Sequence, residues 1–199
     1  MRVAGLLLAA GAGRRMGGPK ALLELDGEPL VGRGIRLLAD GGCSPVVVVV
    51  GAGADDVRPL CAGAQVVAAA GWSTGMGASL RTGLAALDPD VDACVVALVD
   101  QPLVSARAVD LLRAAHAEGA VAAVATYDGK ARNPVLLDRR TWAGVTAAAT
   151  GDEGARGWLR AHPELVVRVD CSGVGSPEDL DTPADLATLT DAARREASR

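Results

Sequence analysis

Short, uninterrupted apolar runs separated by mixed segments dominate the first two thirds of the chain. Five runs are long enough for a strand and lack polar alternation, at residues 3–9, 46–50, 66–70, 94–99 and 120–125. Such runs are typical of strands that are buried on both faces, as in a parallel sheet. We therefore expect a central sheet that is covered on both sides.

Helical spacing appears between the predicted strands. Apolar residues share one helix face in three sets, which are Leu30, Ile35, Leu37 and Leu38, then Leu80, Leu84 and Leu87, then Val109, Leu111 and Leu112. Strands that alternate with helices predict an α/β fold, a three-layer α/β/α sandwich around a mostly parallel, Rossmann-like sheet. Such sheets bind ligands at the carboxyl ends of their strands, so residues that follow strands are the first candidates for a site.

The rest of the chain shows weaker patterns. We expect residues 127–181 to be irregular, and the Thr-Pro pair at 182–183 is a helix-start signal that predicts a C-terminal helix over residues 183–195. A chain of 199 residues is short enough for a single domain, residues 1–199.

Composition and charge exclude several classes of protein. The chain has three Trp, one Tyr and no Phe, so Ala, Val and Leu must fill the core. Its net charge of -4 argues against a nucleic-acid-binding surface, which would need a basic stripe. The four cysteines are widely spaced and there are only two histidines, which favours neither a disulfide framework nor a zinc site. We expect a cytoplasmic protein.

The N-terminus imitates a signal peptide, because Met1-Arg2 precedes a short apolar stretch. That stretch ends in Arg14-Arg15, not in a small-residue cleavage site. No apolar run reaches the roughly 18 residues of a membrane span, so we expect no membrane partner.

A Gly-rich segment directly follows the first predicted strand, with the sequence LAAGAGRRMGGPK over residues 8–20. Small residues let backbone N–H groups approach a phosphate chain, and Arg15 and Lys20 supply positive charge. The spacing fits neither the dinucleotide fingerprint nor a P-loop. The segment therefore predicts a phosphate-binding loop of another kind, the alternative being a flexible turn with solvated cations.

The same segment resembles the LAAGxxxRMGxxK signature of the molybdenum cofactor cytidylyltransferases, members of the NTP-transferase group with its nucleotide-diphospho-sugar transferase fold. Three further segments extend the resemblance over nearly the whole chain: GMGASL at 75–80, DQPL at 100–103 and GDEGAR at 151–156. It implies a nucleotide-binding part (1–126), an acceptor-binding part (127–182) and the C-terminal helix (183–195). The implied reaction transfers CMP from CTP to the phosphate of molybdenum-molybdopterin and releases pyrophosphate.

The resemblance also assigns roles to residues. Catalysis falls to Arg15, Lys20 and Asp100, with Asp100 as the ligand of a Mg²⁺ cofactor. The implied nucleotide-binding residues are Leu8, Ala9, Ala10, Gly11, Gly13, Gly77 and Ser79. The implied acceptor-binding residues are Asn133, Pro134, Gly151, Asp152, Arg156, Asp179 and Asp181. Many relatives have Gly-His before the proline where this chain has Arg132-Asn133, so the match is looser on the acceptor side.

Several of these residues have a purely structural alternative. Ser79, Asp100, Asp179 and Asp181 each stand where they could cap a helix N-terminus. Arg156 could form an ordinary surface salt bridge, which contributes little to stability.

The reaction chemistry agrees with the composition. A phosphate acceptor is already anionic, so its attack needs positioning and charge stabilisation more than a general base, and the chain is poor in histidine. The Ala10 methyl, where related guanylyltransferases carry a second glycine, favours a pyrimidine base. The alternatives are another base or acceptor, such as a phosphorylated acid or sugar, or a nucleotide-binding module without catalysis. The implied protein partner is a client molybdoenzyme or its chaperone.

Overall fold

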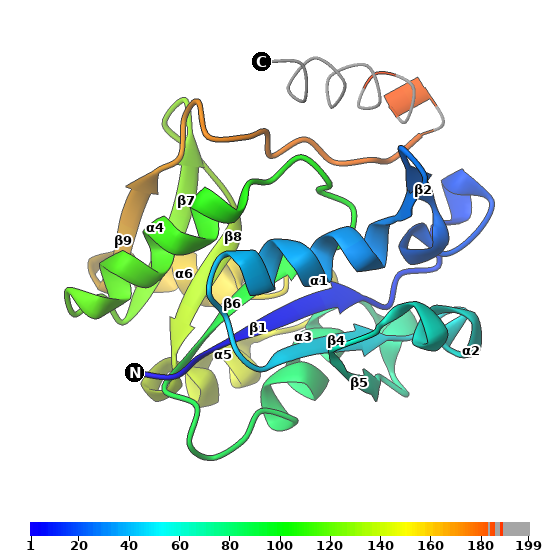
Figure 1. Ribbon diagram of the computed structural model, residues 1–199. Helices are drawn as coiled ribbons and strands as arrows, with labels where there is room; N and C mark the ends of the chain where they lie inside the picture. Colours follow the sequence, from blue (N-terminus) through cyan, green and yellow to red (C-terminus); the bar gives the residue numbers. More distant parts are fainter. Residues whose placement is uncertain (183, 186–187, 189–199) are drawn as a thin grey trace.

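A seven-stranded sheet runs through the middle of the molecule (Figure 1). The computed structural model describes residues 1–182, 184, 185 and 188. The strand order is β5-β4-β1-β6-β8-β7-β9. These strands are β1 (Val3–Ala9), β4 (Val46–Val50), β5 (Gln65–Ala68), β6 (Ala93–Leu98), β7 (Ala122–Tyr127), β8 (Lys130–Asp138) and β9 (Val166–Asp170). A separate two-stranded ribbon pairs β2 (Glu24–Leu25) with β3 (Glu28–Pro29).

The sheet is mostly parallel, as expected. Strand β1 pairs in parallel with β4 and β6, whereas β8 is antiparallel to both of its neighbours, β6 and β7. Leu8 of β1 lies opposite Val49 of β4 and Leu98 of β6, so the carboxyl ends of these strands are level. The chain builds outward from β1 on one side through β4 and β5, and then returns to β6 on the other side. This reversal opens a crevice at the carboxyl ends of β1 and β6, where such sheets bind ligands.

Two helical layers cover the sheet, which confirms the three-layer α/β/α architecture. On one face, α1 (Leu30–Asp40) and α4 (Ala106–Ala117) pack on a cluster that includes Leu7. On the other face, α3 (Met76–Ala85), α5 (Trp142–Ala148) and α6 (Arg156–Ala161) pack on a cluster that includes Leu6 and Leu8. Successive residues of a strand face opposite layers, which is why these strands are apolar throughout. The short α2 (Ala54–Val57) follows β4.

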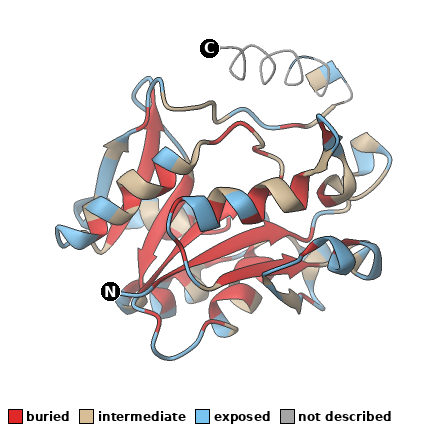
Figure 2. Ribbon diagram, in the orientation of Figure 1, coloured by how far each residue is buried: buried red, intermediate tan, exposed pale blue. Residues whose placement is uncertain are grey.

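Two expectations from the sequence are wrong. Residues 127–181 are not irregular, because they contain β8, α5, α6 and β9. The polar, exposed start of β8 and its Pro134 obscure the strand pattern, since proline is rare within a sheet. In addition, β5 is not buried on both faces, because it is an edge strand with exposed positions (Figure 2).

The predicted C-terminal helix over residues 183–195 lies mostly outside the described residues. Of the helices that are described, none combines the length and the apolar character needed to cross a membrane.

Candidate active site

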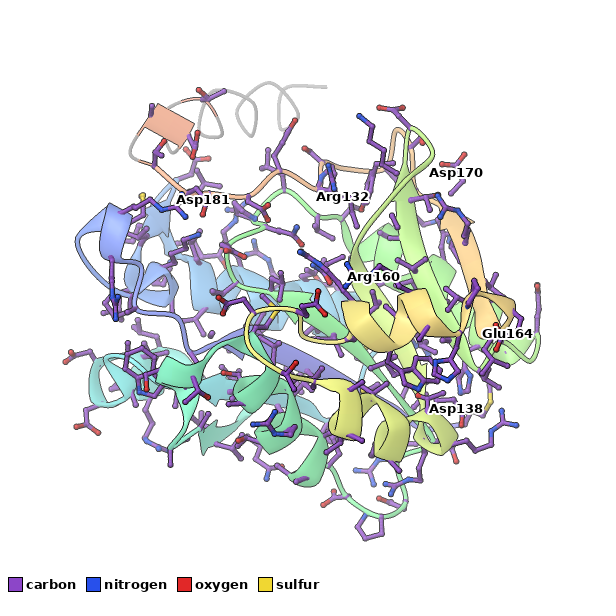
Figure 3. The ribbon with its side chains drawn as sticks, turned by 180° about the vertical axis from the view of Figure 1, so that it is seen from behind. Arg132, Asp138, Arg160, Glu164, Asp170 and Asp181 are labelled. Atoms are coloured by element: carbon purple, nitrogen blue, oxygen red, sulfur yellow. The ribbon has the colours of Figure 1, made fainter. Side chains whose placement is uncertain are left out.

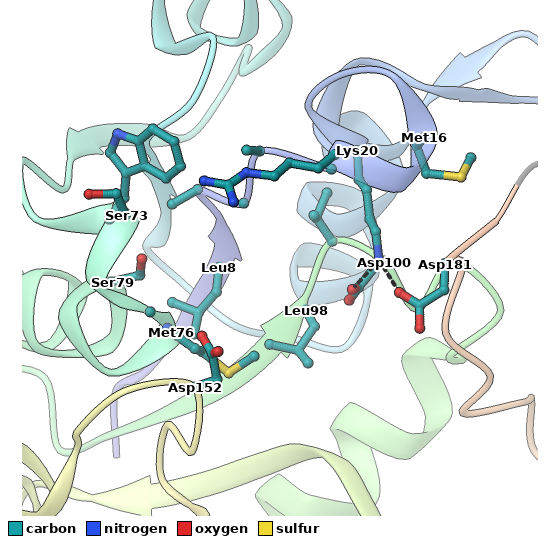
Figure 4. A pocket seen from close by; sticks show the side chains of 18 of the residues that line it. Leu8, Met16, Lys20, Ser73, Met76, Ser79, Leu98, Asp100, Asp152 and Asp181 are labelled. Atoms are coloured by element: carbon teal, nitrogen blue, oxygen red, sulfur yellow. Dashed lines mark hydrogen bonds and ion pairs between the residues drawn. The ribbon is translucent and has the colours of Figure 1, made fainter.

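A cavity of about 520 Å³, here called the first cavity, opens at the carboxyl ends of β1 and β6 (Figure 4). Three segments form its wall: the Gly-rich loop after β1, the turn before α3 and the residues that end β6. Its lining residues from the predicted site are Leu8, Ala10, Gly11, Gly13, Arg15, Lys20, Ser79, Asp100, Asp152 and Asp181. Ala9, by contrast, is buried within β1 and does not line the cavity.

The Gly-rich loop bends tightly over the end of β1. Gly13 has a left-handed backbone with φ of 54°, and a Cβ there would lie 2.0 Å from the carbonyl oxygen of Gly18. Only glycine, which has no Cβ, fits at a distance this short. Arg15 follows in a single 3₁₀ turn, is exposed to the cavity and makes no ion pair within the described residues. Its guanidinium is free to bind an anion in the cavity.

Lys20 joins two carboxylates in the wall of the first cavity. Its Nζ donates to Asp100 Oδ2 at 2.9 Å and to Asp181 Oδ1 at 2.7 Å (Figure 4). Only 15% of the Lys20 side chain is exposed. Burial lowers the pKa of Lys20, but the hydrogen bonds and charges of Asp181 and Asp100 outweigh it and raise the pKa above its usual value. Lys20 is therefore a fixed positive charge that brings two acidic groups together.

The structure rejects a helix-capping role for Asp100. Helix α4 begins at Ala106, and its cap is Ser105, whose hydroxyl accepts a hydrogen bond from the Arg107 N–H. The Asp100 backbone instead anchors the segment of residues 177–181, here called the C-terminal segment, because the Asp100 carbonyl accepts a hydrogen bond from Leu180 N at 2.7 Å. That bond places Asp181 beside Lys20, although the two residues are 161 positions apart.

The turn before α3 forms the wall of the first cavity that faces Lys20 (Figure 4). Helix α3 begins at Met76, so Ser79 lies inside its first turn, where it is 4% exposed and lines the cavity without capping the helix. Gly77 N donates to Gly151 O at 2.8 Å, and Met76 N donates to Asp152 Oδ1 at 3.3 Å. Gly77 and Gly151 thus join two loops and stay outside the cavity lining.

A second cavity, of about 1030 Å³, lies beside the first, over β7, β8, β9 and α6. Of the residues expected to bind the acceptor, Asn133, Arg156 and Asp179 line it, whereas Asp152 and Asp181 line the first cavity and Pro134 is buried outside both. Its basic lining residues are Lys130, Arg132, Arg156, Arg160 and Arg168, two of which are labelled in Figure 3. Its acidic lining residues are Asp128, Glu178 and Asp179, so the five basic and three acidic side chains leave a formal charge of +2 on the lining. The second cavity is therefore net positive in a chain whose net charge is -4.

The two cavities are neighbours. Arg156 and Asn133 also line a small void of about 20 Å³ that reaches Leu8 and Met76, which belong to the wall of the first cavity. Arg156 makes no ion pair among the described residues, so its surface salt-bridge alternative is not realised there. A molecule in the second cavity can therefore approach one in the first.

Gln101 connects the end of β6 to the C-terminal segment. Its Nε2 donates to Asp179 Oδ1 at 2.9 Å and to Pro177 O at 3.1 Å. Burial raises the pKa of Asp179 and the charges of Asp100 and Asp181 add to this, while Gln101 and Lys20 lower it by less. Asp179 is therefore held close to other acids by a neutral hydrogen bond, not by a cation.

Sequence reasoning missed several residues of the first cavity, above all Trp72 and Met76. Trp72 carried a usable signal: it is one of only three tryptophans and stands next to a Gly-rich turn after a predicted strand. Met76 and Gln101 also carried a signal, because they stand in the GMGASL and DQPL segments of the resemblance, but neither was assigned a role.

Comparison with known proteins identifies the family of this chain. A model of the MobA-like NTP transferase domain matches residues 5–166. The chain is 41% identical to nicotine blue oxidoreductase of Paenarthrobacter nicotinovorans, covering 94% of this chain and 96% of that one. It is 30% identical to molybdenum cofactor guanylyltransferase of Rhodobacter capsulatus, covering 99% and 100%.

Solved structures share the fold of this chain. A homologue of Mycobacterium tuberculosis Rv0371c from Mycobacterium sp. strain JC1 superposes with a TM-score of 0.84 at 30% identity, covering 98% of this chain and 99% of that one. Rv0371c of strain H37Rv, solved in complex with manganese, has a TM-score of 0.82 at 24% identity, covering 96% and 100%. With the domain match spanning most of its length, the chain belongs to the MobA-like NTP transferase family.

Proposed function

We propose that this protein transfers CMP from CTP to a phosphorylated small molecule, with release of pyrophosphate. The observation that carries the proposal is the meeting of Lys20, Asp100 and Asp181 beside the Gly-rich loop, at the crevice between β1 and β6. This arrangement combines a Gly-rich loop suited to phosphate, a partly buried cation and two acids in a single cavity.

The first cavity would hold the triphosphate along the Gly-rich loop. Arg15 and Lys20 line it as positive charges, and backbone N–H groups of small residues can approach phosphate oxygens closely. Ala10 is buried at the cavity wall, and its methyl narrows the base end, which favours CTP over a purine nucleotide.

The acids fit a divalent cation. Asp100 and Asp181 both contact one ammonium group, so they lie close enough to share one positive ion. Among the described residues no third His, Cys, Asp or Glu completes a metal site. Two carboxylates suit Mg²⁺, which usually keeps waters and takes its other ligands from substrate phosphates. Bound there, Mg²⁺ would neutralise charge on the phosphates as pyrophosphate leaves.

Side chains of both cavities would position the two reactants. Lys20 would exchange its two carboxylate partners for phosphate oxygens when CTP binds, and Arg15 would hold the leaving pyrophosphate. The acceptor phosphate would lie near Arg156 and Asn133, between the two cavities. These groups would hold the acceptor phosphate in line with the phosphate that it attacks, against the repulsion between the two anions. Because the acceptor phosphate is already anionic, no general base is required.

The acceptor proposed on family grounds is molybdenum-molybdopterin. The basic lining of the second cavity supports an anionic acceptor. The related molybdenum cofactor guanylyltransferase of R. capsulatus, which covers 99% of this chain, supports molybdenum cofactor chemistry. A client molybdoenzyme or its chaperone would then receive the product.

The test is incubation of the protein with Mg²⁺, molybdenum-molybdopterin and each of the four NTPs in turn. Pyrophosphate release and the mass of the product identify the base and the acceptor together. We expect turnover with CTP and a cytosine dinucleotide product. Preference for GTP would overturn the cytidylyl assignment, and tight CTP binding without pyrophosphate release for any acceptor would favour a non-catalytic module.

A second candidate function is an oxidoreductase activity, favoured by the relative named nicotine blue oxidoreductase at 41% identity over 94% of this chain. The first cavity would then hold the phosphates of a nucleotide cofactor instead of a substrate. Oxidation of reduced nicotinamide dinucleotide in the presence of nicotine blue, without pyrophosphate release from any NTP, would establish this function in place of nucleotidyl transfer.

A further inference from the structure

Trp72 is the aromatic residue of the first cavity. It begins the 3₁₀ turn Trp72–Thr74 between β5 and α3, is partly exposed, and has no aromatic companion in the described lining. The other two tryptophans, Trp142 and Trp158, are core residues with 8% and 6% exposure. In a chain this poor in aromatic residues, a partly exposed indole at a cavity is a strong candidate for a ligand contact.

The indole lies at the Ala10 end of the first cavity. A Cβ added to Gly51 would lie 2.5 Å from Trp72 Cγ and 2.7 Å from the carbonyl oxygen of Ala10. Gly51 is therefore the shared neighbour of the indole and of Ala10, and its lack of a side chain gives the ring its space.

Lys20, Asp100 and Asp181 occupy the other end. Figure 4 shows Ser73, which follows Trp72 in the chain, across the cavity from Lys20, Asp100 and Asp181. The first cavity thus has an aromatic end, where Asp152 also accepts a hydrogen bond from Met76 N, and an opposite end with one cation and two acids. A nucleotide has the same two-part chemistry, with a flat base at one end and a triphosphate at the other.

We infer that the indole of Trp72 is the surface on which the nucleotide base stacks. This inference rests on the proposed function, and it assigns a positioning residue for the base that the family signature does not contain. Every base has a π face, so stacking contributes affinity without selecting among bases. Trp72 therefore sets how tightly a base is held, while Ala10 limits which base fits.

Calorimetric titration with two ligands tests the inference. CTP carries a base, whereas inorganic tripolyphosphate supplies the phosphates alone. Trp72→Ala should weaken CTP binding by about tenfold and leave tripolyphosphate binding unchanged, because alanine removes only the stacking surface. Trp72→Phe should retain most of the CTP affinity, because phenylalanine keeps an aromatic face.

Tryptophan fluorescence gives an independent readout. CTP should quench part of the emission of the wild-type protein, and tripolyphosphate should not. Trp72→Phe should abolish this quenching, whereas the matched change Trp158→Phe, in a residue that does not line the first cavity, should preserve it. Circular dichroism of each variant verifies its fold.

Two results would overturn the inference. One is a folded Trp72→Ala protein that binds CTP as tightly as the wild type does, and the other is an equal loss of CTP and tripolyphosphate binding. Failure of the wild type to bind CTP at all would instead remove the proposed function, and the inference with it.

Discussion

The two cavities are built by different means. The first cavity is formed by the loops that leave the carboxyl ends of β1 and β6 and by the turn before α3, and its lysine is already paired with two acids. The second is lined by long side chains on β8, β9 and α6, and its Lys130, Arg132 and Arg156 have no ion pair within the described residues. The strand-end loops and the ion pairs of Lys20 thus hold the groups of the first cavity in place before a ligand binds. In the second cavity, much of the positive charge comes from individual side chains that are not paired in the part of the chain that the structure describes.

This difference indicates where the substrates of related enzymes can diverge. A phosphate-binding loop at a strand end depends on backbone geometry that many sequences can satisfy. A set of exposed cations can be altered one residue at a time without disturbing the core, because surface substitutions change stability little. The acceptor should therefore be the more variable substrate.

The largest predicted effect is a loss of activity caused by a change in the first cavity. Lys20→Ala should lower kcat/KM for CTP by about a hundredfold or more, roughly 3 kcal/mol, because the missing charge acts on phosphates as pyrophosphate leaves. Steady-state assays of pyrophosphate release measure this loss, and a thermal melt shows whether the variant is folded. Normal kinetics in the variant would remove Lys20 from the mechanism.

A slightly smaller loss should follow from Asp100→Asn, which keeps the shape of the side chain and removes its charge. Activity should fall steeply and recover in part at high Mg²⁺ or with Mn²⁺, because an amide oxygen is a weaker ligand for a hard cation. Assays over a metal series, beside manganese binding followed by electron paramagnetic resonance, measure the effect. An active variant with the wild-type metal midpoint would refute the metal role of Asp100.

The second cavity should respond differently. Arg156→Ala should raise KM for the acceptor by about tenfold and leave KM for CTP unchanged, since the lost contact is a charge-assisted hydrogen bond to an anion. Initial rates with each substrate varied in turn separate the two constants. The matched control is Arg107→Ala, an exposed arginine on α4 outside both cavities. Equal changes in both KM values would show that the two cavities are not functionally separate.

The smallest effect concerns stability. Because burial and the charges of Asp100 and Asp181 raise the pKa of Asp179, the folded state favours its protonated form. The associated stability is present below the ordinary carboxyl pKa and is lost as the pH rises through the raised value. Asp179→Asn should therefore stabilise the protein at pH 7, by less than about 1 kcal/mol since Asp179 is exposed. Thermal melts should show this difference vanishing below about pH 4.

Sequence pattern predicted the first cavity better than the second. The bounds of β1 and β4 match the predicted runs, and the Gly-rich loop and Asp100 follow their strands as expected. β8 was missed because its pairing with β6 and β7 stabilises a strand whose own sequence begins polar and contains Pro134. Tertiary pairing overrides weak local preference, so the wall of the second cavity was hidden from the pattern.

The sequence by itself determined the layered fold and the loop chemistry, because apolar periodicity and closely spaced Gly, Arg and Lys residues are local properties. Only the tertiary structure decided which distant groups meet. Lys20 reaches Asp181 across 161 positions because Leu180 bonds to the backbone of Asp100, and Trp72 reaches Ala10 because Gly51 leaves room for its ring. Such contacts depend on strand order and close packing, which no local pattern of residues records.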